Sequence, residues 1–157
     1  MAPNTASLLP IIPRIFFLYI EPVLITIGMI KQYATTHALF AATTSSAPAP
    51  LPVPALAGPA LSAGYLLSMM LYGLMVLLAA PPSATLLRLH IGVLVVADLT
   101  HWAGLLATLA RAHPRGWAGA LDTAAWSADT WDLARFPLYT LAVKGLTLAG
   151  AFGRIGG

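Results

Sequence analysis

The stretch His90-Ile-Gly-Val-Leu-Val-Val-Ala-Asp98-Leu-Thr-His101-Trp102 decides how this chain must fold. It lies within an apolar segment, residues 85–110, that exceeds the roughly 20 residues a helix needs to cross a bilayer. Asp98 falls near the middle of that segment, where a charge costs about 2.5–3.5 kcal/mol on insertion scales. Because an ionisable group at that depth marks a functional site by default, Asp98 is the first candidate site residue.

The composition predicts that lipid is the main solvent of the chain. Of its 157 residues, 59% are hydrophobic and only 8% are charged, whereas soluble domains carry about 25% charged residues. So few charges cannot cover a globule of this size, and membrane lipids are therefore the expected partners. The net charge of +3 comes from scattered residues without a basic run, so no nucleic-acid partner is expected. The chain has no cysteine, which excludes disulfides and thiolate chemistry.

Four segments are long and apolar enough to span a bilayer as helices. They cover about residues 14–33, 61–80, 85–110 and 131–152. The predicted fold class is all-α integral membrane, a four-transmembrane-helix bundle that forms a single domain over residues 1–157.

The links between these segments differ in character. The proline pair Pro81-Pro82 is a tight break, so the second and third segments are expected to be antiparallel neighbours. The Pro/Ala-rich loop at residues 35–60 favours extended, polyproline-like structure. The link at residues 112–130 contains tryptophans, which gather at the headgroup level of membranes. It is predicted to lie along the membrane surface, or to fold over the bundle as a lid.

Helical geometry places the polar residues of the third segment on one face. At about 100° per residue, His101 lies roughly 20° and Asp98 roughly 80° around the helix from His90. That face is expected to point into the bundle, because lipid offers ionised groups no partners. Trp102 lies one turn beyond Asp98 and could form a wall of the same cavity.

The first segment contributes an acid beside a proline. Arg14 and Glu21 are spaced by seven residues and share one stripe of the helix. Pro22 removes a backbone donor, which should loosen the hydrogen-bond ladder near Leu18. Glu21 is therefore expected at a kink.

Lys144 offers Asp98 a partner. Each lies about twelve residues into its own segment, and those segments run in opposite directions, so both should reach mid-membrane. An ion pair between them would neutralise two charges at once. Such a pair could fix the helix register without any chemistry, or the carboxylate could be used functionally. Both interpretations stay open.

Acid–base chemistry on a lipophilic substrate fits these residue types best. Glu21 or Asp98 would donate the proton, and His101 would serve as base or relay. Aromatic faces can stabilise a developing carbocation, and Arg14 or Lys144 would tune the carboxylates. The residues expected to bind substrate are Arg14, Tyr19, Tyr72, His90, Trp102 and Lys144. Asp-x-x-His alone is a weak metal signature, so neither a metal nor another cofactor is expected.

The string Arg14-Ile-Phe-Phe-Leu-Tyr-Ile-Glu-Pro22, followed by Gly28, resembles the opening signature of a fungal family. That family comprises small four-helix membrane proteins catalogued mainly as a domain of unknown function. The resemblance continues through Ala97-Asp98-Leu99-Thr100-His101 and the tryptophan-containing link. It implies a role in fungal secondary metabolism and singles out Arg14, Tyr19, Glu21, Asp98 and His101. More distantly, the compact bundle resembles emopamil-binding sterol isomerases and membrane terpene cyclases.

The chain is therefore expected to be a membrane-embedded cyclase or isomerase. Its substrate would be a hydrophobic terpenoid or polyketide-derived intermediate, and its location the endoplasmic reticulum or another endomembrane. A non-catalytic scaffold that holds other enzymes of the same pathway is the alternative. A small carrier is disfavoured, because the sequence contains no inverted repeat.

Overall fold

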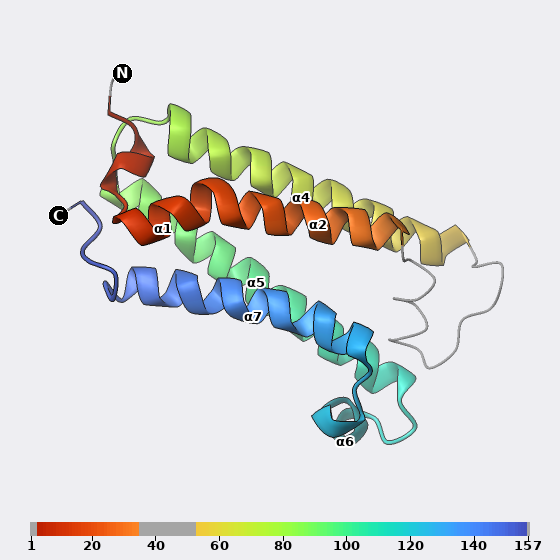
Figure 1. The fold of residues 1–157 in the computed structure, drawn as a ribbon. Coiled ribbons are helices and arrows are strands. Elements are labelled where there is room, and N and C mark those ends of the chain that lie inside the picture. Colours follow the sequence, from red (N-terminus) through yellow and green to blue (C-terminus); the bar gives the residue numbers. More distant parts are fainter. Residues whose placement is uncertain (1–2, 35–52, 157) are drawn as a thin grey trace.

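A computed structural model describes residues 3–34 and 53–156, and this part of the chain is all helical (Figure 1). Four helical rods run along one another. The first consists of α1 (Ile11–Ile15), a π-helix (Phe16–Ile20) and α2 (Glu21–Ala34), and the others are α4 (Val53–Ala79), α5 (Ala84–Ala112) and α7 (Ala128–Leu148). Short elements are a 3-10 helix (Thr5–Leu8), α6 (Trp117–Ala120) and a 3-10 helix (Thr123–Ala125).

The observed helices match the four predicted segments, with one substantial correction. Helix α4 begins at Val53 and not near residue 61, so the end of the Pro/Ala-rich loop is helical and not extended. Pro54 lies in the first turn of α4, where the backbone N–H groups have no helical partner to lose. The rest of that loop, residues 35–52, lies outside the described residues.

The rods form two antiparallel pairs that cross each other. Helix α2 packs on α4, and α5 packs on α7, while α4 and α5 contact each other less (Figure 1). The predicted break between α4 and α5 is present, and Ser83 caps α5 by accepting a hydrogen bond from the N–H of Leu86. The hydrophobic core lies toward the end of the bundle where both termini lie (Figure 1). It includes Leu9, Phe16, Phe17, Leu77, Leu87, Ile91 and Ile155.

The segment before α1 closes that end of the bundle. Thr5 is fully buried, and its hydroxyl donates to the carbonyl of Pro81 at 2.7 Å. Its backbone N–H donates to the carbonyl of Ala80 at 3.1 Å. These bonds satisfy carbonyls that follow the last turn of α4 and would otherwise lack partners.

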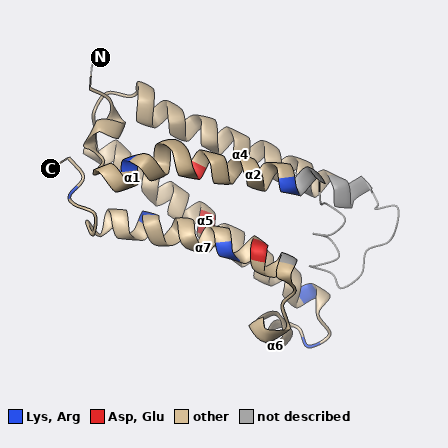
Figure 2. Cartoon of the chain, viewed as in Figure 1, with Lys and Arg blue, Asp and Glu red and all other residues tan. Residues whose placement is uncertain are grey.

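Three helical stretches are long and apolar enough to cross a membrane, namely Ile11–Lys31, Ala60–Ala79 and Ala84–Ala112. Large apolar side chains on these stretches, such as Leu61, Met75 and Leu89, point outward and are exposed. Helix α4 carries no charged residue at all (Figure 2). So extensive an apolar surface favours membrane association over contact with water.

The tryptophan-containing link folds back onto the end of the α5–α7 pair. The indole N–H of Trp126 donates to the carbonyl of Ala120 at 2.9 Å. The ring of Trp126 contacts both Trp102 on α5 and Trp131 on α7, with centroids 6.2 and 5.0 Å away. Trp117 on α6 remains exposed. The link therefore fastens the two helices together at their connection.

Replacing Thr5 by valine keeps the side-chain shape but leaves the Pro81 carbonyl without its hydroxyl donor. We expect Thr5→Val to lower the free energy of unfolding by about 1–3 kcal/mol, since an unsatisfied buried acceptor costs about that much. Thr5→Ser, which retains the hydroxyl, should lose less. Thermal unfolding of the detergent-solubilised protein measures both. Equal midpoints for wild type and Thr5→Val would contradict this role.

Candidate functional site

Lys144 on α7 binds two carboxylates from two other helices. Its Nζ lies 2.7 Å from Oε1 of Glu21, at the start of α2, and 2.8 Å from Oδ2 of Asp98 on α5. The side chains of Lys144, Glu21 and Asp98 are 3%, 8% and 15% exposed. We call these three residues the charged triad. It joins the α2–α4 pair to the α5–α7 pair.

The hydroxyl of Thr140 adds a neutral contact to the triad. Thr140 lies one turn before Lys144 on the same face of α7, and its Oγ1 donates to Oδ2 of Asp98 at 2.9 Å. Asp98 is thus held by two side chains of α7. An Asp98–Lys144 ion pair was one of the interpretations that the sequence left open, and the structure contains it. The sequence also named Lys144 as a group that could tune Glu21 and Asp98, but it did not predict Thr140 as a partner. The spacing of four between Thr140 and Lys144 was the signal available for the threonine.

A π-helix directly precedes Glu21. The backbone N–H of Glu21 donates to the carbonyl of Phe16, five residues earlier instead of four. Pro22 cannot supply the N–H that would bond to Leu18, so the ladder is loosened where the sequence predicted it. Single π-turns of this kind occur frequently at functional sites. This one sets the angle at which Glu21 leaves the first rod.

His90 lies beside the triad in a buried setting. It is 5% exposed, and its ring fits against Gly73, where an added Cβ would lie only 3.2 Å from the ring atom Cε1. His90 and Glu21 both line a cavity of about 20 Å³ between α2, α4 and α5, which is room for about one water molecule. Within the described chain, Nδ1 of His90 has no hydrogen-bond partner. The cavity thus combines a carboxylate with an imidazole nitrogen.

His101 has a partner that the sequence analysis did not foresee. Its Nε2 lies 3.1 Å from the carbonyl oxygen of Leu133 on α7. Pro137, four residues after Leu133, lies inside α7 and has no N–H to bond to that carbonyl. His101 therefore occupies the hydrogen-bonding position left open by a proline, and its contact is with the α7 backbone and not with the triad.

A groove of about 280 Å³ runs along α5 and α7 beside this contact. It is lined by Thr100, His101, Gly104, Leu105, Thr108 and Leu133, and we call it the α5–α7 groove. It begins within one helical turn of Asp98. The triad and the groove therefore lie close to each other along the sequence of α5.

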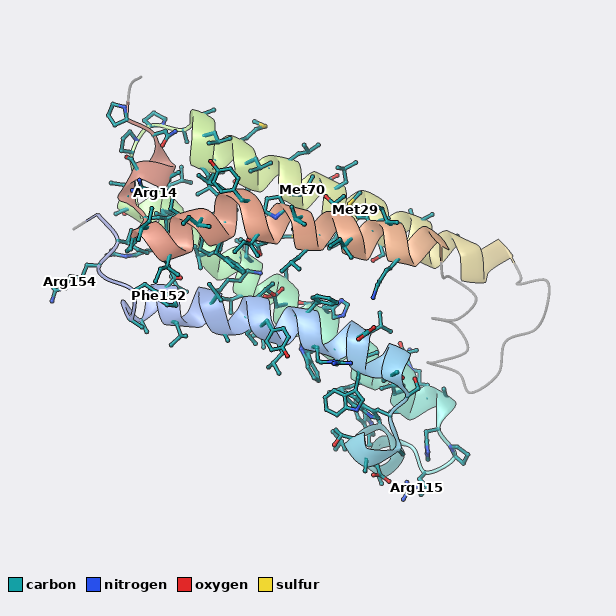
Figure 3. The ribbon with its side chains drawn as sticks, viewed as in Figure 1. Arg14, Met29, Met70, Arg115, Phe152 and Arg154 are labelled. Atoms are coloured by element: carbon teal, nitrogen blue, oxygen red, sulfur yellow. The ribbon has the colours of Figure 1, made fainter. Side chains whose placement is uncertain are left out.

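The other predicted site residues lie apart from the triad. Arg14 donates to the carbonyls of Ser7 and Leu9, both at 2.8 Å, at the end of the bundle where the termini lie (Figure 3). It forms no ion pair among residues 3–34 and 53–156, so it does not tune the carboxylates by direct contact. Tyr19 and Tyr72 are exposed on the outside of the bundle, but the ring of Tyr72 packs edge-on against His90, with the ring centroids 6.2 Å apart. Trp102 belongs to the tryptophan contacts described above.

The chemistry available at this site is proton transfer and ion pairing. In the part of the chain that the structure describes, no three His, Asp or Glu side chains are grouped so that they could hold a metal ion. The triad places two carboxylates against one ammonium group, and His90 adds an imidazole nitrogen at the adjoining cavity.

The comparisons with known proteins identify a family but no function. Neither the functionally described proteins nor the solved structures contain a match. A family model described as a domain of unknown function, DUF7704, matches residues 6–154. That match covers the triad, the cavity and the groove, and the chain therefore belongs to the DUF7704 family.

Proposed function

We propose that the chain spans an endomembrane four times, with α7 as the fourth span. Helix α7 has four charged residues in its sequence, Asp129, Asp132, Arg135 and Lys144, against three in each of Ile11–Lys31 and Ala84–Ala112 and none in Ala60–Ala79. Asp132 and Arg135 bond to each other near the start of the helix, and Lys144 is neutralised by the triad. With its deepest charge paired, α7 can lie in hydrocarbon at a much lower cost.

We further propose that the triad performs acid–base catalysis as a membrane-embedded cyclase or isomerase. The supporting observation is that two buried carboxylates share a single ammonium group. Together they carry one negative charge, and a proton on either carboxylate would neutralise it. A buried negative charge is costly in a low-dielectric interior, so such a site is suited to accepting a proton and giving it up again.

The two carboxylates take different roles in this proposal. Asp98 is the most exposed member of the triad and lies within one turn of the α5–α7 groove, so it exchanges a proton with the substrate. Glu21 and His90 meet at the cavity of about 20 Å³ and pass the proton onward. In an isomerisation, one carbon of a double bond gains a proton and a neighbouring carbon loses one. The reaction therefore balances without a cofactor.

The substrate class follows from the surroundings of the site. An apolar molecule dissolved in the bilayer can reach the groove sideways, without passing through water. The resemblance to proteins of fungal secondary metabolism supports a terpenoid or polyketide-derived intermediate, and other enzymes of such a pathway as partners. It also supports the endoplasmic reticulum as the membrane.

A non-catalytic scaffold is the second candidate, and one observation favours it. The triad connects α2, α5 and α7, and a second ion pair, Lys31–Asp132 at 3.4 Å, also joins α2 to α7, so the triad can serve purely to hold two helix pairs in register. The protein would then organise pathway enzymes without converting a substrate.

Glu21→Gln and Asp98→Asn test the catalytic proposal, because each removes a proton-transferring group while keeping its shape. We expect each to lower turnover by about 10²–10⁴-fold, which is the usual contribution of a general acid or base. The measurement is product formation in microsomes that also contain the other enzymes of the same biosynthetic pathway. Asp122→Asn is the matched control, since it changes an exposed acid paired with Arg115 and should leave turnover intact. An unchanged product profile for both site variants would favour the scaffold.

Lys144→Met tests the structural contribution of the triad. It leaves two buried carboxylates without a cation, and we expect it to cost about 3–5 kcal/mol of stability. The neutral triple variant Glu21→Gln/Asp98→Asn/Lys144→Met should recover most of that loss. Unfolding midpoints in detergent compare the three proteins. Exchanging Asp98 and Lys144 would be less informative, because it places a new carboxylate against Glu21. A Lys144→Met protein as stable as wild type would show that the triad does not hold the helices.

A further inference from the structure

The α5–α7 groove combines apolar side chains with a few polar groups that can accept hydrogen bonds but not donate them. Leu105 and Leu133 supply apolar surface. The hydroxyls of Thr100 and Thr108 donate to carbonyls of their own helix, Val96 at 2.7 Å and Gly104 at 2.8 Å. The hydroxyl hydrogens of both threonines are therefore already in hydrogen bonds, and only their oxygens are left to accept one from a ligand.

The bond between His101 and Leu133 fixes which ring nitrogen carries the proton. A backbone carbonyl can only accept a hydrogen bond, so Nε2 of His101 must be the donor. In a neutral imidazole the other nitrogen, Nδ1, then has a lone pair and can only accept. Pro137 is the origin of this arrangement, because it leaves the Leu133 carbonyl in need of a donor. The polar groups of these groove residues are thus acceptors, which match a ligand that carries a hydroxyl donor.

We propose that the α5–α7 groove binds a lipophilic alcohol, whose hydroxyl donates a hydrogen bond to Nδ1 of His101. A volume of about 280 Å³ accommodates a substantial part of an isoprenoid, sterol or long-chain alcohol, with the remainder in lipid. That the bound alcohol is the substrate rests on the proposed function. That the groove binds an alcohol does not, because binding is measured without turnover.

The test uses photoactivatable farnesol and its methyl ether, which differ by one methyl group on the oxygen and therefore in whether that oxygen can donate a hydrogen bond. Each diazirine-bearing probe is cross-linked to the full chain in lipid nanodiscs, and the labelled peptides are quantified by mass spectrometry. We expect the alcohol to label the α5 and α7 peptides at the groove roughly two- to tenfold more than the ether, as one hydrogen bond allows.

Two His101 variants separate hydrogen bonding from shape. His101→Met removes both nitrogens and should label equally with the two probes. His101→Gln retains an N–H for the Leu133 carbonyl and an oxygen that accepts, so it should keep a preference for the alcohol. Loss of the preference in His101→Met together with its retention in His101→Gln supports the assignment.

Two glycine variants test the place of binding without altering His101. An added Cβ meets no atom within 4 Å at Gly104 or at Gly92, so a side chain can leave the backbone at either position without a clash at Cβ. Gly104→Leu fills the groove and should abolish labelling there by both probes. Gly92→Leu, on the same helix and outside the residues that line the groove, should not. Equal labelling by alcohol and ether in the wild type, or unchanged labelling in Gly104→Leu, would overturn the proposal. Conversion of the bound alcohol by the wild type, and its loss in Glu21→Gln and Asp98→Asn, decides separately whether that alcohol is a substrate.

Discussion

The ammonium group of Lys144 must be neutralised by the protein itself, because its side chain is 3% exposed and the surrounding helices are apolar. Both available acids come from other helices, Glu21 from α2 and Asp98 from α5. Helix α7 therefore cannot take its position unless α2 and α5 are already close. The same contact that permits a charge in α7 also joins the two helix pairs, so the packing of the bundle and the chemistry of its centre depend on one group of atoms.

Prolines shape the site by removing donors in two different ways. Near Pro22 the backbone responds by widening into a π-turn, which changes the direction in which Glu21 points. At Pro137 the helix continues, and the side chain of His101 supplies the missing donor from α5. The first proline thus places an acid in the triad. The second fixes the protonation pattern of a histidine at the neighbouring groove.

The sequence predicted most of the helical architecture because two quantities can be counted along the chain. They are the length of each apolar segment and the distance of a residue from the ends of its segment. Those quantities gave α5 almost to the residue and paired Asp98 with Lys144. They could not show that Glu21 shares the same lysine, since that depends on how two helix pairs cross. His101 was expected to relay protons, yet its bond to Leu133 arises from Pro137 on another helix. Arg14 bonds to carbonyls of the preceding turn, a local alternative that the stripe with Glu21 did not reveal.

The tryptophan contacts at the end of the α5–α7 pair give the protein a built-in optical reporter. Three of its four tryptophans are linked by contacts, since the ring of Trp126 lies 6.2 Å from that of Trp102 and 5.0 Å from that of Trp131, and Trp102 directly follows the groove residue His101 in the sequence. Most of the intrinsic fluorescence therefore originates from one end of the molecule. Emission from this cluster senses the separation of α5 and α7, so occupation of the groove can be followed in the unmodified protein without an attached dye.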